Sequence, residues 1–78
     1  MKKEVLLTDL KENQRALIVS ILGGQMVNKR LADLGLTPRA KIKVLRKAPF
    51  CGPIEIEARG SKLILGRGLS SKILVKPK

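Results

Sequence analysis

The chain has 78 residues, a net charge of +11, 44% hydrophobic residues and one aromatic side chain, Phe50. This length predicts a single small domain over residues 1–78 with an aliphatic core, and it leaves no room for a separate catalytic domain. The hydrophobic content excludes a disordered chain, and the single cysteine excludes an internal disulfide. No apolar run is long enough to span a membrane, and the N-terminus lacks the features of a signal peptide, so we expect a cytoplasmic protein.

The positive charge is distributed unevenly along the chain. Residues 1–22 carry four basic and three acidic side chains, a net of +1. Residues 23–78 carry thirteen basic and three acidic side chains, a net of +10. Such a surface attracts polyanions, namely nucleic acid, an anionic membrane surface or an acidic partner protein. A basic surface that mainly confers solubility is an equally good interpretation of charge alone.

The first clear strand is predicted over residues 16–22, ALIVSIL, because β-branched residues are frequent in this run and two glycines follow it. The next segment, GQMVNKRLADLGLTP, predicts the clearest helix of the chain. Val27, Leu31 and Leu34 repeat there at helical spacing and form one apolar stripe.

The end of this helix has its own sequence signal. Gly35 follows the last periodic residue and favours a left-handed cap, so that Leu36 can fold back onto the last turn. Pro38 then prevents the helix from resuming.

Two alternating segments, AKIKVLRK and PIEIEARG, flank the loop APFCGP and predict a β-hairpin. In the second segment Ile54, Ile56 and Ala58 are expected to point inward. Because apolar side chains must face each other, Val44 is expected opposite Ile54 or Ile56. Lys43 then lies opposite one of the two glutamates of the second segment, and we expect a cross-strand ion pair on the solvent face.

The remaining sequence predicts a strand in SKLILGRG (residues 61–68), a helical turn in LSSKI and a closing strand in ILVKP. The fold class expected from this order is mainly β with one helix. It is a small, partly closed barrel of five strands with the helix after the first strand.

Residues with catalytic chemistry are scarce. The chain has no histidine, which excludes a His-based triad or a His-rich metal site. Glu55 and Glu57 are expected to face lysines and to serve structure. Cys51 has no base and no second thiol, so a turn or packing role is favoured over a reactive thiol, which stays open as an alternative. We therefore expect no enzyme, no cofactor and no metal site.

The stretch RLADLGLTPRAKIKVLRKAPFCGPIEIEARGSKLILGRGLSSKILVKP resembles the FeoA family of ferrous iron transport proteins, which are small SH3-like domains. The resemblance extends over about residues 16–77. It depends on the corner LGLTP, the loop PFCGP, the strand EIEARGSKLIL and the closing ILV, in this order and spacing. The sequence departs from the family at Arg39 and Cys51, where glycine is frequent, and in GRGLSSK.

The resemblance implies a non-enzymatic cytoplasmic accessory protein of ferrous iron uptake. It implies docking on FeoB, a membrane transporter with a cytoplasmic G-protein domain, and the basic surface would suit a position beside an anionic membrane. The chain has no helix-turn-helix, so it is not one of the iron-dependent repressors that share the fold. We expect the partner surface at the corner and the loop, in Leu36, Pro38, Arg39, Arg46, Lys47, Pro49, Phe50, Cys51, Gly52 and Pro53.

Two alternatives remain at this point. Phe50 either anchors a partner or folds into the core. The charge of +11 also suits a small barrel that binds nucleic acid, although the lack of aromatic stacking platforms argues against it.

Overall fold

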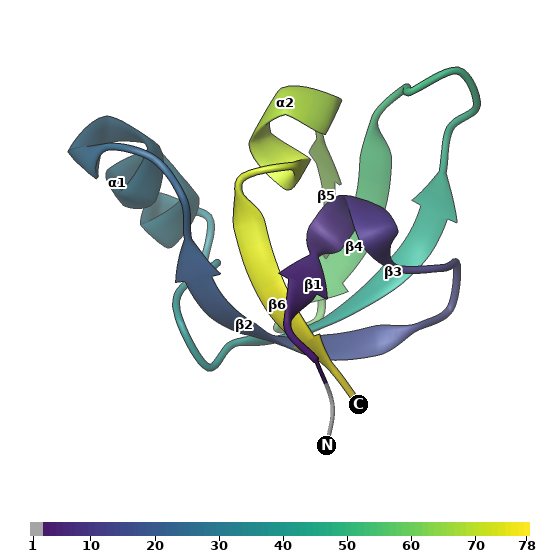
Figure 1. Cartoon of the computed structure of the whole chain (residues 1–78), viewed down its shortest axis with the longest axis horizontal. Helices are drawn as coiled ribbons and strands as arrows, with labels where there is room; N and C mark the ends of the chain where they lie inside the picture. The colour runs from purple at the N-terminus through teal and green to yellow at the C-terminus, as the bar shows by residue number, and fades with distance from the viewer. Residues whose placement is uncertain (1–2) are drawn as a thin grey trace.

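Figure 1 shows the computed structural model, which describes residues 3–78. Residues 1 and 2 of the predicted domain lie outside the described residues. The elements in chain order are β1 (Val5–Leu6), the 3₁₀ helix η1 (Leu7–Asp9), β2 (Arg15–Ile21), α1 (Gln25–Asp33), β3 (Lys41–Lys47), β4 (Ile54–Ala58), β5 (Ser61–Leu65), α2 (Arg67–Ser70) and β6 (Ile73–Pro77).

The strands form one antiparallel sheet in the order β1-β6-β2-β3-β4-β5. The sheet is strongly curved, with α1 beside one end and α2 above it (Figure 1). The mainly β fold with its longer helix ahead of the central hairpin is confirmed.

The number of strands differs from the prediction, because residues 3–78 form six strands and the longer helix follows the second of them. The additional strand is β1, in which Val5 pairs with Val75 and Leu6 with Leu74. Two residues are too few to show a strand periodicity, and only the distant partner β6 makes this segment a strand. The strand predicted over residues 61–68 ends earlier, at Leu65, and the predicted helical turn begins at Arg67.

The core lies inside the curve of the sheet and is aliphatic, as expected. The predicted inward residues Ile54, Ile56 and Ala58 are buried, as is Val44 from the facing strand. Burial of one such large aliphatic side chain contributes about 1.5–3 kcal/mol to folding. The inner row of the β3–β4 hairpin therefore contributes a large share of the stability of this small protein.

The C-terminus of α1 adopts the predicted left-handed cap. Gly35 has a φ of 86°, its N–H donates to the Ala32 carbonyl at 2.9 Å, and the Leu36 N–H donates to the Leu31 carbonyl at 2.9 Å. This pattern is a Schellman motif, in which the residue after the glycine folds back onto the helix. Leu36 and Leu31 are both fully buried. Leu34, predicted on the apolar stripe, is instead 42% exposed, because Leu36 occupies the core position.

The register of the hairpin is one of the two that the sequence allowed. Val44 pairs with Ile56 and Lys43 with Glu57, and a bulge between Val44 and Arg46 then shifts the register by one residue. The expected ion pair is not formed in the described part of the chain, since the charged groups of Lys43 and Glu57 do not approach within 4.0 Å. Opposite charges thus share a row on the solvent face without direct contact.

We expect Leu36→Ala to lower the free energy of unfolding by about 2–5 kcal/mol, because it leaves a cavity beneath the Schellman motif. Leu34→Ala, only two residues away, should cost less than about 1 kcal/mol because that side chain is partly solvated. Urea denaturation of the two variants measures both values. Equal losses would contradict the placement of these two leucines.

Candidate functional site

The candidate sites among the described residues are exposed surfaces and not an enclosed catalytic or metal-binding site. Within residues 3–78 no group of three or more His, Cys, Asp or Glu side chains is arranged to hold a metal ion. None of the described helices has the length and apolar composition needed to cross a membrane. The features that stand out are an exposed aromatic side chain and an excess of positive charge.

The first feature is the tip of the β3–β4 hairpin, residues 48–53. The Ala48 N–H donates to the Pro53 carbonyl at 3.0 Å, and the Gly52 N–H donates to the Pro49 carbonyl at 3.1 Å. The two residues between them, Phe50 and Cys51, both have a φ of 58°. Positive φ at both central positions is the signature of a type I′ turn, which normally contains Asn-Gly or a similar pair.

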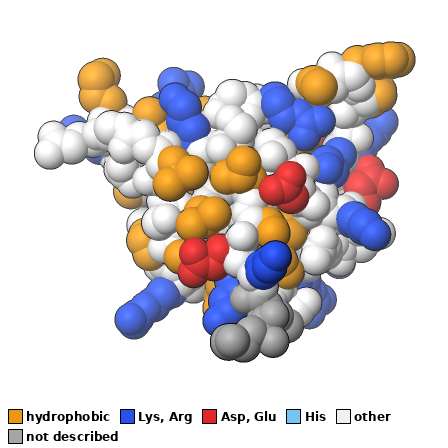
Figure 2. All heavy atoms as spheres, viewed as in Figure 1, with side chains coloured by type: hydrophobic (Ala, Val, Ile, Leu, Met, Phe, Trp, Pro, Cys, Tyr) orange, Lys and Arg blue, Asp and Glu red, His pale blue; other side chains and the backbone are white. Residues whose placement is uncertain are grey.

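This backbone directs Phe50 into solvent. Its side chain is 99% exposed, so the structure decides against a core position for the only aromatic residue. Pro49, Cys51 and Pro53 are exposed beside it, and Cys51 is a free thiol. Figure 2 shows hydrophobic side chains protruding at this end of the molecule. The tip is therefore an apolar projection from a charged protein.

Gly52 permits the close approach of the two sides of the tip. A Cβ at this position would lie 2.8 Å from the Ala48 Cβ and 3.1 Å from the Pro49 carbonyl oxygen. A side chain at position 52 would therefore force the hairpin apart. Gly52 belongs to the predicted partner surface, and its observable role is to shape the turn that carries Phe50.

The two basic residues at the base of the tip have different roles. The Lys47 ammonium donates to the carbonyls of Thr8 and Leu10 at 2.8 and 2.9 Å, and the Lys47 backbone N–H donates to a Glu12 carboxylate oxygen at 3.0 Å. Lys47 thus ties the end of β3 to the N-terminal segment. Arg46 is exposed and faces solvent on the opposite side of the strand.

The predicted corner, residues 36–39, lies at the other end of β3 (Figure 1). β3 is about 20 Å long at roughly 3.3 Å per residue, so the corner and the tip do not form one site. Leu36 is buried, whereas Pro38 and Arg39 are exposed. Arg39 has a φ of 74° in a turn closed by the Ala40 N–H and the Thr37 carbonyl at 3.0 Å. This is the position of a type II turn that favours glycine.

One exposed hydrophobic residue near the tip was not among the predicted site residues. Ile64 of β5 lies opposite Glu55 and is 71% exposed. Together with Arg46, Ala48 and Pro53 it lines a shallow groove of about 160 Å³ below the tip. Alternation in SKLIL could have indicated it, because Leu63 and Leu65 on the inner face put Ile64 outside.

We expect Lys47→Met to lower the free energy of unfolding by about 1.5–3 kcal/mol, because two backbone carbonyls lose a charged donor while the aliphatic stem is kept. Arg46→Met removes the same charge from the adjacent position and should change stability by less than about 0.5 kcal/mol. Thermal and urea denaturation of the pair provide the test. A neutral Lys47→Met would show that its hydrogen bonds do not stabilise the fold.

Comparisons with known proteins agree with this architecture. The FeoA domain family matches residues 5–77. This match begins earlier in the chain than the resemblance predicted over residues 16–77. A protein of Methanocaldococcus jannaschii, named as an Fe(2+) transport protein A, is 35% identical over 66 residues, covering 85% of this chain and 78% of the relative. A crystal structure of an iron uptake regulatory protein, FeoA, has a TM-score of 0.90 and 34% identity, covering 97% of this chain and 100% of that one.

A more distant structure supports the fold alone. The zinc complex of FeoA from Stenotrophomonas maltophilia, described as a procaryotic SH3 domain protein, has a TM-score of 0.78 at 17% identity. It covers 91% of this chain and 88% of its own. The family match and the two relatives above 30% identity carry the assignment. The chain therefore belongs to the FeoA family, the ferrous iron transport proteins with an SH3-like fold that act as non-enzymatic accessory proteins.

Proposed function

We propose that the protein is a cytoplasmic regulatory partner of ferrous iron uptake that docks, through its hairpin tip, on the cytoplasmic G-protein domain of a FeoB-type transporter. Membership of the FeoA family supports the association with this transport system. The related crystal structure of an iron uptake regulatory protein supports a regulatory role. The observation that carries the proposal is the 99% exposure of Phe50 at the end of a hydrogen-bonded hairpin.

The residues of the turn favour a role in contact over a role in folding. A left-handed conformation costs a residue other than glycine, asparagine or aspartate about 1–2 kcal/mol, and Phe50 and Cys51 both adopt one. An exposed phenylalanine gains nothing from burial in the free protein. Unfavourable backbone conformations and exposed apolar side chains that do not stabilise the free protein are typical of functional sites.

The tip is also well prepared for binding. Pro49 and Pro53 restrict the backbone, and two cross-strand hydrogen bonds close the loop. A preorganised loop loses little conformational entropy on association. Phe50 can therefore act as an apolar anchor, with Arg46 at the polar margin to meet acidic groups of the partner.

The rest of the predicted partner surface is assigned according to its placement. Pro49, Phe50, Cys51 and Pro53 form the contact, with Gly52 shaping the turn. Lys47 contributes indirectly by stabilising the fold, because its ammonium is already hydrogen-bonded to the Thr8 and Leu10 carbonyls. The exposed part of the corner, Pro38 and Arg39, lies about 20 Å away and is assigned to a second, separate contact.

We expect Phe50→Ala to weaken binding to the purified cytoplasmic domain of the transporter by about thirtyfold, the loss typical of a central aromatic anchor. Isothermal titration calorimetry at low salt measures the affinity. Met26→Ala is the matched control, because Met26 is apolar and 87% exposed on α1, away from the tip. No binding by the wild-type protein, or equal losses for the two variants, would refute docking through the tip.

Cys51 offers an independent readout of the same contact. It is the only cysteine of the chain, so a maleimide fluorophore attaches at one site without mutagenesis. A change in its fluorescence on addition of the transporter domain would place the partner at the tip. The same probe on a Met26→Cys/Cys51→Ser variant should report no change.

We expect Phe50→Asn/Cys51→Gly to raise the free energy of unfolding by about 1 kcal/mol, because Asn-Gly suits a type I′ turn. The same variant should lose binding to the transporter domain, since the anchor is gone. Urea denaturation and calorimetry on one preparation measure both effects. A less stable variant would show that Phe50 and Cys51 support the fold, contrary to their exposure.

A further inference from the structure

A second surface lies on the exposed side of the sheet, away from the tip. In one cross-strand row, Arg15 pairs with Lys43, Lys43 with Glu57, and Glu57 with Lys62. In the neighbouring row, Leu17 pairs with Lys76 on one side and with Lys41 on the other. Directly paired residues share a face of the sheet. We name the cations of these two rows the basic face, which comprises Arg15, Lys41, Lys43, Lys62 and Lys76.

The arrangement of charge on this face is unfavourable for the isolated protein. Arg15 lies directly opposite Lys43, and like charges in that arrangement destabilise a sheet. The one acid of the row, Glu57, lies beside Lys43 and Lys62, and among the described side chains neither lysine comes within 4.0 Å of its carboxylate. The positive charges are therefore left for an external anion to neutralise.

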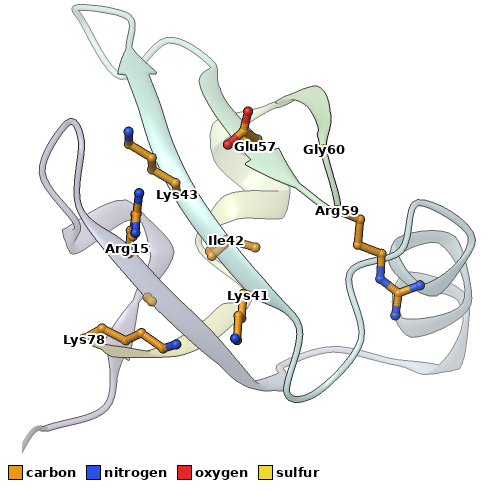
Figure 3. A pocket seen from close by; sticks show the side chains of 9 residues that line it. Arg15, Lys41, Ile42, Lys43, Glu57, Arg59, Gly60 and Lys78 are labelled. Carbon is orange, nitrogen blue, oxygen red and sulfur yellow. The ribbon is translucent and has the colours of Figure 1, made fainter.

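The middle of the face is hollowed. A groove of about 330 Å³ is bordered by Arg15, Lys41 and Lys43, with the C-terminal Lys78 beside them, and the buried Ala16 and Ile42 also line it (Figure 3). These cations come from β2, from β3 and from the residue that follows β6, and they line one groove together with a single acid, Glu57. Such convergence suits several phosphate oxygens at once.

Arg59 also lines the groove, but Figure 3 shows its side chain extending away from Arg15 and Lys43. A Cβ at Gly35 would lie 3.6 Å from the Arg59 Cδ, which places this side chain against the C-terminal end of α1. A cation is favourable there because the helix dipole is negative at that end. Arg59 is therefore assigned to the helix and not to the anion.

We infer that the basic face binds the phosphate groups of anionic phospholipids and holds the protein against the membrane. Basic clusters of this kind are attracted to anionic lipid surfaces. Nucleic acid fits less well, because single-strand binding also uses aromatic stacking, and the only aromatic side chain lies on the tip. The choice of lipid rests on the transport function of the family, because ferrous iron must cross a membrane.

Binding at the basic face leaves the tip accessible to a second partner. The tip extends beyond the end of the β3–β4 ladder, whereas the residues of the basic face lie within β2, β3, β5 and β6. A protein held by its basic face would still present Phe50. Lipid binding would thereby raise the local concentration of the tip beside a membrane transporter.

The test is co-sedimentation of the full chain with vesicles. We expect binding to vesicles of equal parts phosphatidylcholine and phosphatidylglycerol, and none to pure phosphatidylcholine. Binding should fall steeply with added salt, because exposed charges are screened. Arg15→Gln/Lys43→Gln should weaken binding at least about tenfold, given the contribution expected from two basic residues near an anionic surface.

The matched control is Lys29→Gln/Arg30→Gln, which removes one lysine and one arginine from exposed positions on α1. It should bind nearly as well as the wild type. Thermal denaturation without lipid should show Arg15→Gln/Lys43→Gln to be at least as stable as the wild type, since a repulsive pair is removed. This measurement separates lost binding from lost folding.

Several results would overturn the inference. They are an absence of binding to the anionic vesicles, equal losses for the two double variants, and displacement of the vesicles by an oligonucleotide whose binding needs Arg15 and Lys43. The vesicles contain no transporter, and the docking assay contains no lipid. Failure of this inference and failure of the proposed docking are therefore distinguishable.

Discussion

The pairing of β3 with β4 is the constraint on which both surfaces depend. Because side chains alternate along a strand, placing Val44 against Ile56 in the core also places Lys43 beside Glu57 on the exposed face. The same ladder ends in the tip and so determines the direction in which Phe50 projects. A slip of one residue would bury charged side chains and expose the apolar row. The native register is favoured because a slipped hairpin would lose the free energy of burying these apolar side chains.

Three of the five described residues other than glycine that have a positive φ lie at the two ends of β3, where the chain leaves the ladder. Phe50 and Cys51 at the tip and Arg39 at the corner all adopt positive φ values, which cost about 1–3 kcal/mol each for residues other than glycine. The turn hydrogen bonds hold these conformations, and at the corner the adjacent Ala40 is buried. A small aliphatic core therefore supports conformations that its own folding does not require.

The acids are arranged differently from the simple expectation of charge pairing. Only one acid, Glu57, lies in the rows of the basic face, and no contact within 4.0 Å to Lys43 or Lys62 neutralises it in the described part of the chain. Elsewhere acids serve the backbone, as when the Asp9 carboxylate accepts from the Leu6 N–H at 3.1 Å. The excess charge is therefore concentrated on a surface and is not consumed within the fold.

The sequence by itself determined the elements with strong local periodicity. It predicted the helix with its glycine cap, the β3–β4 hairpin with its two allowed registers, and the family, because these depend on residue order and spacing. It also located the tip, and it left Phe50 between core and surface. It did not predict β1, because two residues carry no periodicity without their partner β6.

Only the tertiary structure decided which residues act together. It separated the corner from the tip, since β3 is a rigid spacer between them. It showed that Lys47, predicted on the partner surface, uses its ammonium within the fold, where it donates hydrogen bonds to the carbonyls of Thr8 and Leu10. It assembled the basic face from strands distant in sequence. Composition reports how much charge a chain carries, whereas the position of that charge depends on strand register across the whole sheet.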